Sequence, residues 1–106
     1  MSISMSITKR MSGESAEVPV ATNATYHSYW KRAAVELNLE MIDALGALWI
    51  TAQFKDQFVD ELGKLRTWTL DRINNDPYMP EMLRRIDAIV EAIRLYPIDE
   101  YEISFG

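Results

Sequence analysis

Three carboxylates near the middle of the chain recur at helical spacing, and this pattern could carry chemistry. Glu36, Glu40 and Asp43 are separated by four and three residues, which places them along one side of a helix. Such a ridge could bind a divalent cation or supply an acid–base pair. A solvated polar edge is the commoner reason for such a pattern. Asp43 stands out because it borders an uncharged segment.

The single histidine, His27, lies among aromatic residues in the segment TYHSYW. A histidine in this setting can act as a general base, line an aromatic ligand pocket, or simply pack at the surface. The chain contains no cysteine, which excludes disulfides, thiolate nucleophiles and cysteine-based metal sites. We therefore expect no cofactor and no metal. If the chain is an enzyme, the candidate catalytic residues are Asp43, Glu40, Glu36 and His27.

The composition is that of one acidic globular domain. The chain has 106 residues, 48% of them hydrophobic, and a net charge of −5. This charge argues against nonspecific binding to nucleic acid or to an anionic membrane. The basic residues form only small, scattered spots, which also argues against DNA recognition. No apolar run approaches the roughly 20 residues of a membrane span. Without a signal peptide or cysteine, we expect a cytoplasmic protein.

Both ends of the chain show features of extended structure. Residues 1–24 are rich in serine, threonine and small residues, which favours a flexible leader, although apolar and polar residues alternate at its start. Residues 98–106 alternate as well, which predicts a short strand with one apolar face. This C-terminal tail could pair with the N-terminal alternation, join a partner's sheet, or lie over the helices. The alternating apolar residues are Met1, Ile3, Met5, Ile7, Tyr101, Ile103 and Phe105.

Between these ends, apolar residues recur every three or four positions, as in a helix. No proline occurs between Val20 and Asp76, but globular helices usually run about 8–20 residues. We therefore expect at least one break, with an N-cap at Asn38 or a boundary within 53–56. Pro80 is expected to begin a last helix. The sequence thus predicts an all-α fold. It would be a small bundle of three to four helices over residues 25–97, with a flexible leader and an extended tail.

Residues 44–54 contain no charged side chain. On a helical wheel, the apolar residues of 39–50 occupy both halves, and a helix that is apolar all round must be buried all round. So small a domain has little material to enclose such a helix. The third helix and the tail could cover the second face, but we predict a partner protein or a second copy of the chain. The predicted partner-binding residues are Leu45, Trp49, Ile50, Phe54, Phe58, Tyr101, Ile103 and Phe105.

These observations favour a non-enzymatic protein-interaction module. Such a protein would be an accessory or regulatory subunit, an inhibitor or an adaptor, and it would act through an apolar helix face and the acidic-aromatic tail. The expected partner is another protein or the chain itself, as a homodimer. The alternative is a small all-helical enzyme whose active site forms between subunits from the carboxylates and the histidine.

Overall fold

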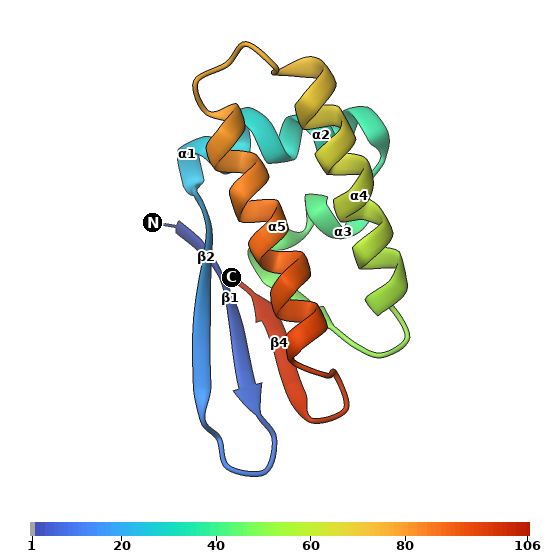
Figure 1. The fold of residues 1–106 in the computed structure, drawn as a ribbon. Coiled ribbons are helices and arrows are strands. Elements are labelled where there is room, and N and C mark those ends of the chain that lie inside the picture. The colour runs from blue at the N-terminus through green and yellow to red at the C-terminus, as the bar shows by residue number, and fades with distance from the viewer. Residues whose placement is uncertain (1) are drawn as a thin grey trace.

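Four antiparallel strands form a sheet in the order β2-β1-β4-β3, and helices pack on one of its faces (Figure 1). The computed structural model describes residues 2–106. The fold is α+β, so the expectation of an all-α bundle is wrong. The strands are β1 (Ser2–Lys9), β2 (Ser15–Thr22), β3 (Leu48–Ile50) and β4 (Tyr101–Phe105).

The helical layer consists of two long helices and several short ones. In Figure 1 the long helices α4 and α5 run side by side, and α5 passes in front of the sheet. Their apolar faces meet the apolar face of the sheet in one core. The long helices are α4 (Lys55–Arg72) and α5 (Met79–Leu95). The short ones are α1 (Asn23–Thr25), the π-helix η1 (Tyr26–Trp30), α2 (Lys31–Leu37), α3 (Glu40–Asp43) and the 3₁₀-helix η2 (Leu45–Ala47).

The predicted flexible leader is instead the hairpin of β1 and β2. The alternation along β1 is a true strand period, because Ile3, Met5 and Ile7 are buried against the helices. The intervening residues Ser4 and Ser6 lie on the opposite face, which none of the helices in residues 2–106 covers. Their small polar side chains resemble those of a linker in composition but suit the open face of an antiparallel sheet. Met1 lies outside the described residues.

The C-terminal tail is a central strand of the sheet. β4 pairs with β1, so that Phe105 lies opposite Met5 and Ile103 lies opposite Ile7. On its other side, β4 pairs with β3. Of the three arrangements that the sequence left open for the tail, pairing with the N-terminal alternation is the one observed. The first and last strands of the described chain thus form the middle of the sheet.

The uncharged segment does not form an α-helix. It forms η2 and then the edge strand β3, where a period of two turns Ile50 into the core and Trp49 towards solvent. A helical wheel places Trp49 and Ile50 on the same half of a helix, whereas the alternation of a strand places their side chains on opposite faces of the sheet. The predicted breaks fall in the right places, with one change of role. Asn38 is the left-handed C-cap of α2, at φ 57, rather than an N-cap, and α4 begins at Lys55.

A buried carboxylate ties α4 to the short helix α3. Glu61 is only 5% exposed, and its Oε1 accepts hydrogen bonds from the backbone N–H groups of Met41 (3.0 Å) and Ile42 (3.1 Å). Its Oε2 accepts a hydrogen bond of 3.0 Å from Gln57. Backbone N–H groups in the first turn of a helix have no partner within that helix. Glu61 supplies the missing acceptor and fixes the position of the chain that leads into β3.

Candidate functional site

The carboxylate ridge expected from the sequence does not exist as one surface, because α2 ends at Leu37 and the chain turns at Asn38. Glu36 faces a groove between α2 and α4. Glu40 is exposed at the start of α3, and Asp43 faces a separate hollow. In residues 2–106, no group of three or more histidine or acidic side chains is arranged to hold a metal ion.

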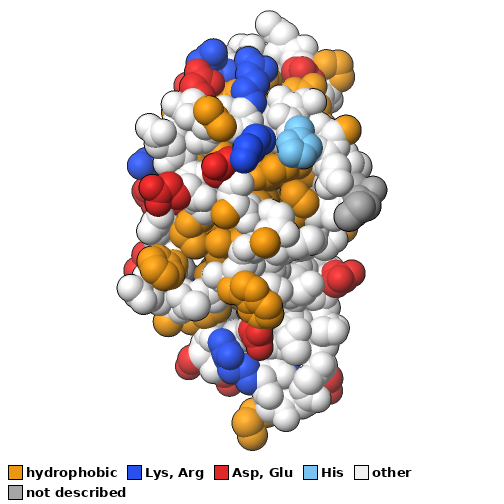
Figure 2. All heavy atoms as spheres, turned by 180° about the vertical axis from the view of Figure 1, so that it is seen from behind, with side chains coloured by type: hydrophobic (Ala, Val, Ile, Leu, Met, Phe, Trp, Pro, Cys, Tyr) orange, Lys and Arg blue, Asp and Glu red, His pale blue; other side chains and the backbone are white. Residues whose placement is uncertain are grey.

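His27 and Asp43 line the same hollow, which has a volume of about 490 Å³. Asp43 forms an ion pair with Lys31, and both side chains are two-fifths exposed or more. The hydrogen bond with Asp43 raises the pKa of Lys31 above its ordinary value. The chain's one histidine lies on the surface in Figure 2, next to a basic side chain. The Asp43 carboxylate is therefore bound by a solvated ammonium, which is a poor setting for an acid–base pair.

The phenol of Tyr26 forms the inner wall of this hollow. Its single O–H lies between two backbone carbonyls that can share it, those of Ile42 (2.7 Å) and Asp43 (3.0 Å). Burial raises the pKa of Tyr26, so this phenol stays protonated and acts as a donor at neutral pH. Both acceptors are backbone groups, so Tyr26 holds the end of α3 in place.

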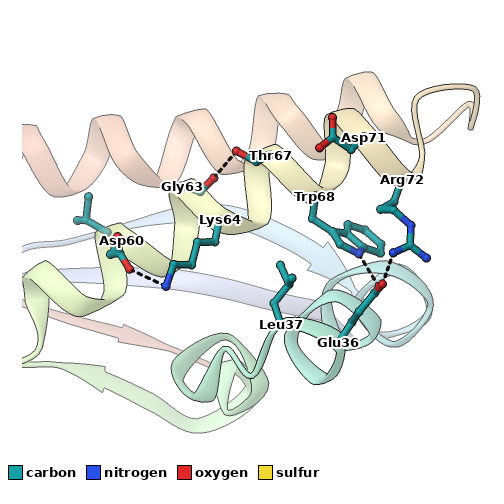
Figure 3. Close-up of a pocket in the computed structure, with 10 residues that line it drawn as sticks. Glu36, Leu37, Asp60, Gly63, Lys64, Thr67, Trp68, Asp71 and Arg72 are labelled. Carbon is teal, nitrogen blue, oxygen red and sulfur yellow. Dashed lines mark hydrogen bonds and ion pairs between the residues drawn. The ribbon is translucent and has the colours of Figure 1, made fainter.

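Figure 3 shows the groove between α2 and α4, which has a volume of about 710 Å³. At one end, Glu36 accepts a hydrogen bond of 2.7 Å from the indole Nε1 of Trp68 and forms an ion pair with Arg72. These partners, the indole N–H first, lower the pKa of Glu36 below its ordinary value. At the other end, Lys64 pairs with Asp60. Most charged groups of the groove are thus already neutralised by one another.

The pKa of Glu36 gives a testable dependence of stability on pH. Because this pKa is lowered in the folded state, ionised Glu36 stabilises the fold above its ordinary value of 4.5, and this stabilisation is lost as the pH falls through the lowered pKa. Glu36→Gln keeps an acceptor for Trp68 but removes the charge. We expect urea unfolding midpoints of the variant and the wild type to differ at pH 7 and to converge in acid. A difference that persists unchanged in acid would contradict this assignment.

The pairing pattern of the sheet determines which backbone groups point outward at the free edge of β3. Ser4 and Gly106 exchange two backbone hydrogen bonds, of 3.0 and 3.1 Å, so the backbone groups of Gly106 point to β1. Along a strand these directions alternate, so those of Phe105 and Ile103 point to β3. Ser104, between them, lies opposite Trp49. The backbone N–H and C=O of Trp49 therefore point away from β4, and no partner for either occurs within residues 2–106.

Large apolar side chains surround this edge. The side chain of Trp49 is 61% exposed, and that of Phe54, which follows β3 in the chain, is 43% exposed. Figure 2 shows hydrophobic side chains gathered across the middle of the face that lies behind the view of Figure 1. Tryptophan and phenylalanine are among the residues most enriched in protein interfaces. We call the outward backbone of Trp49 and the side chains of Trp49 and Phe54 the β3 edge surface.

The opposite edge of the sheet is interrupted at Pro19. In β2, Pro19 lies opposite Ser4 next to a register shift. Because the backbone groups of Ser4 point to β4, those of Pro19, opposite Ser4, point away from β1. Proline has no N–H, so this outward position offers no donor. The outward carbonyl of Pro19 accepts a hydrogen bond of 3.3 Å from Arg85 of α5. Proline, bulges and covering side chains are the usual means of preventing edge-to-edge association. The β3 edge has none of these three.

The predicted partner-binding residues fall into two groups. Trp49 and Phe54 are exposed, whereas most of the others lie in the core or in the central strand, with Tyr101 half-buried. What the sequence reading missed is the outward backbone of Trp49. The alternation Leu48-Trp49-Ile50 was the available signal, but three residues are too few to identify a strand. The buried members are Leu45, Ile50, Phe58, Ile103 and Phe105.

Comparison with family models found no match for this chain. Searches among curated proteins and among solved structures also found no match. Of the helices in residues 2–106, none is long and apolar enough to cross a membrane. The assignment of function therefore depends on the geometry of the surfaces described above.

Proposed function

We propose that this protein is a protein-interaction module, serving as an accessory or regulatory subunit, an inhibitor or an adaptor, and that it binds its partner at the β3 edge surface. The observation that carries the proposal is Trp49. Its side chain is 61% exposed, on a strand whose outward N–H and C=O groups are free. An extended segment that pairs with such an edge gains backbone hydrogen bonds and side-chain contacts together.

The side chains must supply most of the affinity. β3 has three residues, and only Trp49 turns its backbone outward, so pairing adds about two hydrogen bonds of roughly 1 kcal/mol each. Burying the ring of Trp49 adds more, because a large aromatic side chain buries about 150–250 Å². Tryptophan is also the residue type most often found as an interface hot spot. This is the same residue that the sequence analysis identified, now on a strand edge instead of a helix face.

Charge supports a protein partner over a nucleic acid. Residues 44–54 carry no charge within a chain whose net charge is −5. A polyanion would be repelled by the protein and would find no basic residue in this segment. A protein surface that is apolar at its centre fits it better, and that partner can be a second copy, as a homodimer. A chain without cysteine suits a reducing compartment, and we propose the cytoplasm as its location.

The hollow beside His27 supports an enzyme less well. His27 and Asp43 do line one cavity, which is the arrangement an acid–base pair would need. However, the carboxylate is already paired with Lys31, and solvent reaches both members of the pair. A catalytic carboxylate near neutral pH usually needs burial or a like charge to tune its pKa.

The proposal can be tested by affinity capture with matched surface variants. Tagged wild type, Trp49→Ser and Val35→Ser would be incubated with lysate of the source organism containing an untagged second copy of the chain. Val35 is a suitable control because it is 63% exposed but lies on α2. We expect one protein, or the untagged copy, to be retained by wild type and Val35→Ser and reduced about tenfold or more by Trp49→Ser.

Quantitative mass spectrometry would measure the retained proteins, and circular dichroism would confirm that all three chains are folded. If wild type and Trp49→Ser retain the same proteins in the same amounts, the β3 edge surface is not the binding site and the proposal fails.

A further inference from the structure

We infer that the β3 edge binds a second copy of this chain, with the two β3 strands antiparallel across a two-fold axis at Trp49. This inference rests on the proposed function, because it names the partner of the same surface. The result would be one continuous sheet of eight strands, four from each copy, with both helical layers on the same side.

The outward backbone groups of Trp49 suit pairing with the same residue of a second copy. When a two-fold axis relates two antiparallel strands, one residue lies opposite its own copy. If the backbone groups of that residue point outward, the two copies exchange two N–H···O=C bonds. Trp49 is the central residue of β3 and is the one whose N–H and C=O point away from β4. The pair needs no change in the register of the existing sheet.

The side chains gain from the same symmetry. Directly opposed residues in a hydrogen-bonded pair have Cα atoms about 5.5 Å apart and share one face of the sheet. The two Trp49 rings would therefore lie side by side on the face that the helices leave open. Each Phe54 would lie at the margin of the interface, close to the partner chain. The contact thus buries both Trp49 rings, one from each copy.

The β3 edge is the place where charge opposes contact between two acidic molecules least. Copies with a net charge of −5 repel one another. Residues 44–54 contain no charged side chain, so a contact centred on Trp49 brings no carboxylates of this segment together. Other surfaces of the chain are less suitable for self-association. The groove between α2 and α4, for example, is lined by charged side chains of both signs, with Asp71 left over beyond the two ion pairs.

Two-fold pairing at β3 gives an assembly that closes at two copies. If both edges of the sheet were free, strand pairing would continue and produce open assemblies. In this chain, Pro19 and its contact with Arg85 interrupt the second edge. An interface that uses the same patch on both copies is closed under two-fold symmetry. The two-fold symmetry of the β3 contact therefore favours a dimer over a fibre.

A proline at position 49 tests the backbone part of this inference. Trp49→Pro removes the outward N–H without removing a hydrogen bond to β4. The preceding residue, Leu48, has φ −126° and ψ 134°, a conformation that residues before proline readily adopt. Trp49→Val keeps the N–H and removes the ring. Both variants, with wild type and the control Val35→Ser, would be examined by sedimentation equilibrium over a range of concentrations.

We expect wild type and Val35→Ser to dimerise with similar affinity. Trp49→Val should raise the dissociation constant about tenfold, and Trp49→Pro more, because it lacks both the ring and the donor. Circular dichroism must show native secondary structure in each variant. A wild type that stays monomeric at every concentration, or a dimer that Trp49→Pro does not weaken, would overturn the inference.

The register can be tested separately, because the natural chain has no cysteine. In Trp49→Cys at high concentration, the two Cα atoms would be about 5.5 Å apart, which is within the range for a disulfide. We expect the oxidised dimer to form faster than in Val35→Cys, and equal rates would contradict the register. A monomeric chain that loses a different captured protein on Trp49→Ser would overturn the self-pairing and leave the proposed function standing.

Discussion

A chain truncated after Pro97 is expected to lose its cooperative fold. The deletion removes β4, which lies between β1 and β3. It also removes Ile103 and Phe105, which are 1% and 3% exposed. Truncating a large buried apolar residue costs about 2–5 kcal/mol, and domains of this size have only about 5–15 kcal/mol in total. We expect circular dichroism to show loss of the sheet and urea unfolding to show no cooperative transition.

Substitutions in the complete chain provide the control for this experiment. The double variant Ile103→Ser and Phe105→Ser should reproduce most of the loss, since both side chains face the core. Ser104→Thr should leave the unfolding midpoint close to that of wild type, because Ser104 lies on the open face of the same strand. A truncated chain with a wild-type midpoint would show that β4 is dispensable.

Replacing Glu61 with leucine is expected to lower the free energy of unfolding by about 3 kcal/mol. The substitution leaves the buried N–H groups of Met41 and Ile42 without an acceptor, and each unsatisfied buried donor costs about 1–3 kcal/mol. The gain from a buried apolar side chain offsets part of this cost. Urea unfolding at pH 7 measures the change. Hydrogen exchange at Met41 and Ile42 should become faster, because these amides lose their bonds.

Glu61→Gln separates the acceptor from the charge. Its side-chain oxygen can still accept the two backbone hydrogen bonds, so we expect it to lose only about 1 kcal/mol. If the leucine and glutamine variants are equally stable, the hydrogen bonds to α3 are not what makes Glu61 important.

The sequence predicts the helical parts of this fold better than its sheet. The period of Leu83, Ile86, Ile89, Val90 and Ile93 indicates α5, and Pro77 and Pro97 delimit it. Ile86, Ile89 and Ile93 are buried in the core, although Val90 is 37% exposed, so the local pattern is sufficient to identify the helix. Residues 2–22 form a hairpin whose open face carries serines. Composition alone cannot distinguish such a face from a linker, because what stabilises β1 is its pairing with β4 at the other end of the chain.

The prediction for residues 44–54 went wrong for a related reason. Leu45, Leu48 and Ala52 fit a helical period, but Leu48 and Ile50 pair with Phe105 and Ile103. Tertiary pairing overrides local periodicity in such short segments. The exposure of Trp49 follows from the strand register and was out of reach of the sequence. That a partner surface exists near Trp49 was inferred from the lack of charge, and this inference remains a proposal.

The central pairing of β1 with β4 has a consequence for how the protein is made. While the ribosome synthesises residues 10–100, β1 can pair only with β2, and its other edge stays open. A strand edge whose partner strand has not yet been synthesised is a site at which nascent chains aggregate or bind a chaperone. Closing the sheet also requires joining segments far apart in sequence, which slows folding. Ser4 and Ser6 make one face of the β1–β2 hairpin polar, so the hairpin is not apolar on both faces before β4 is added.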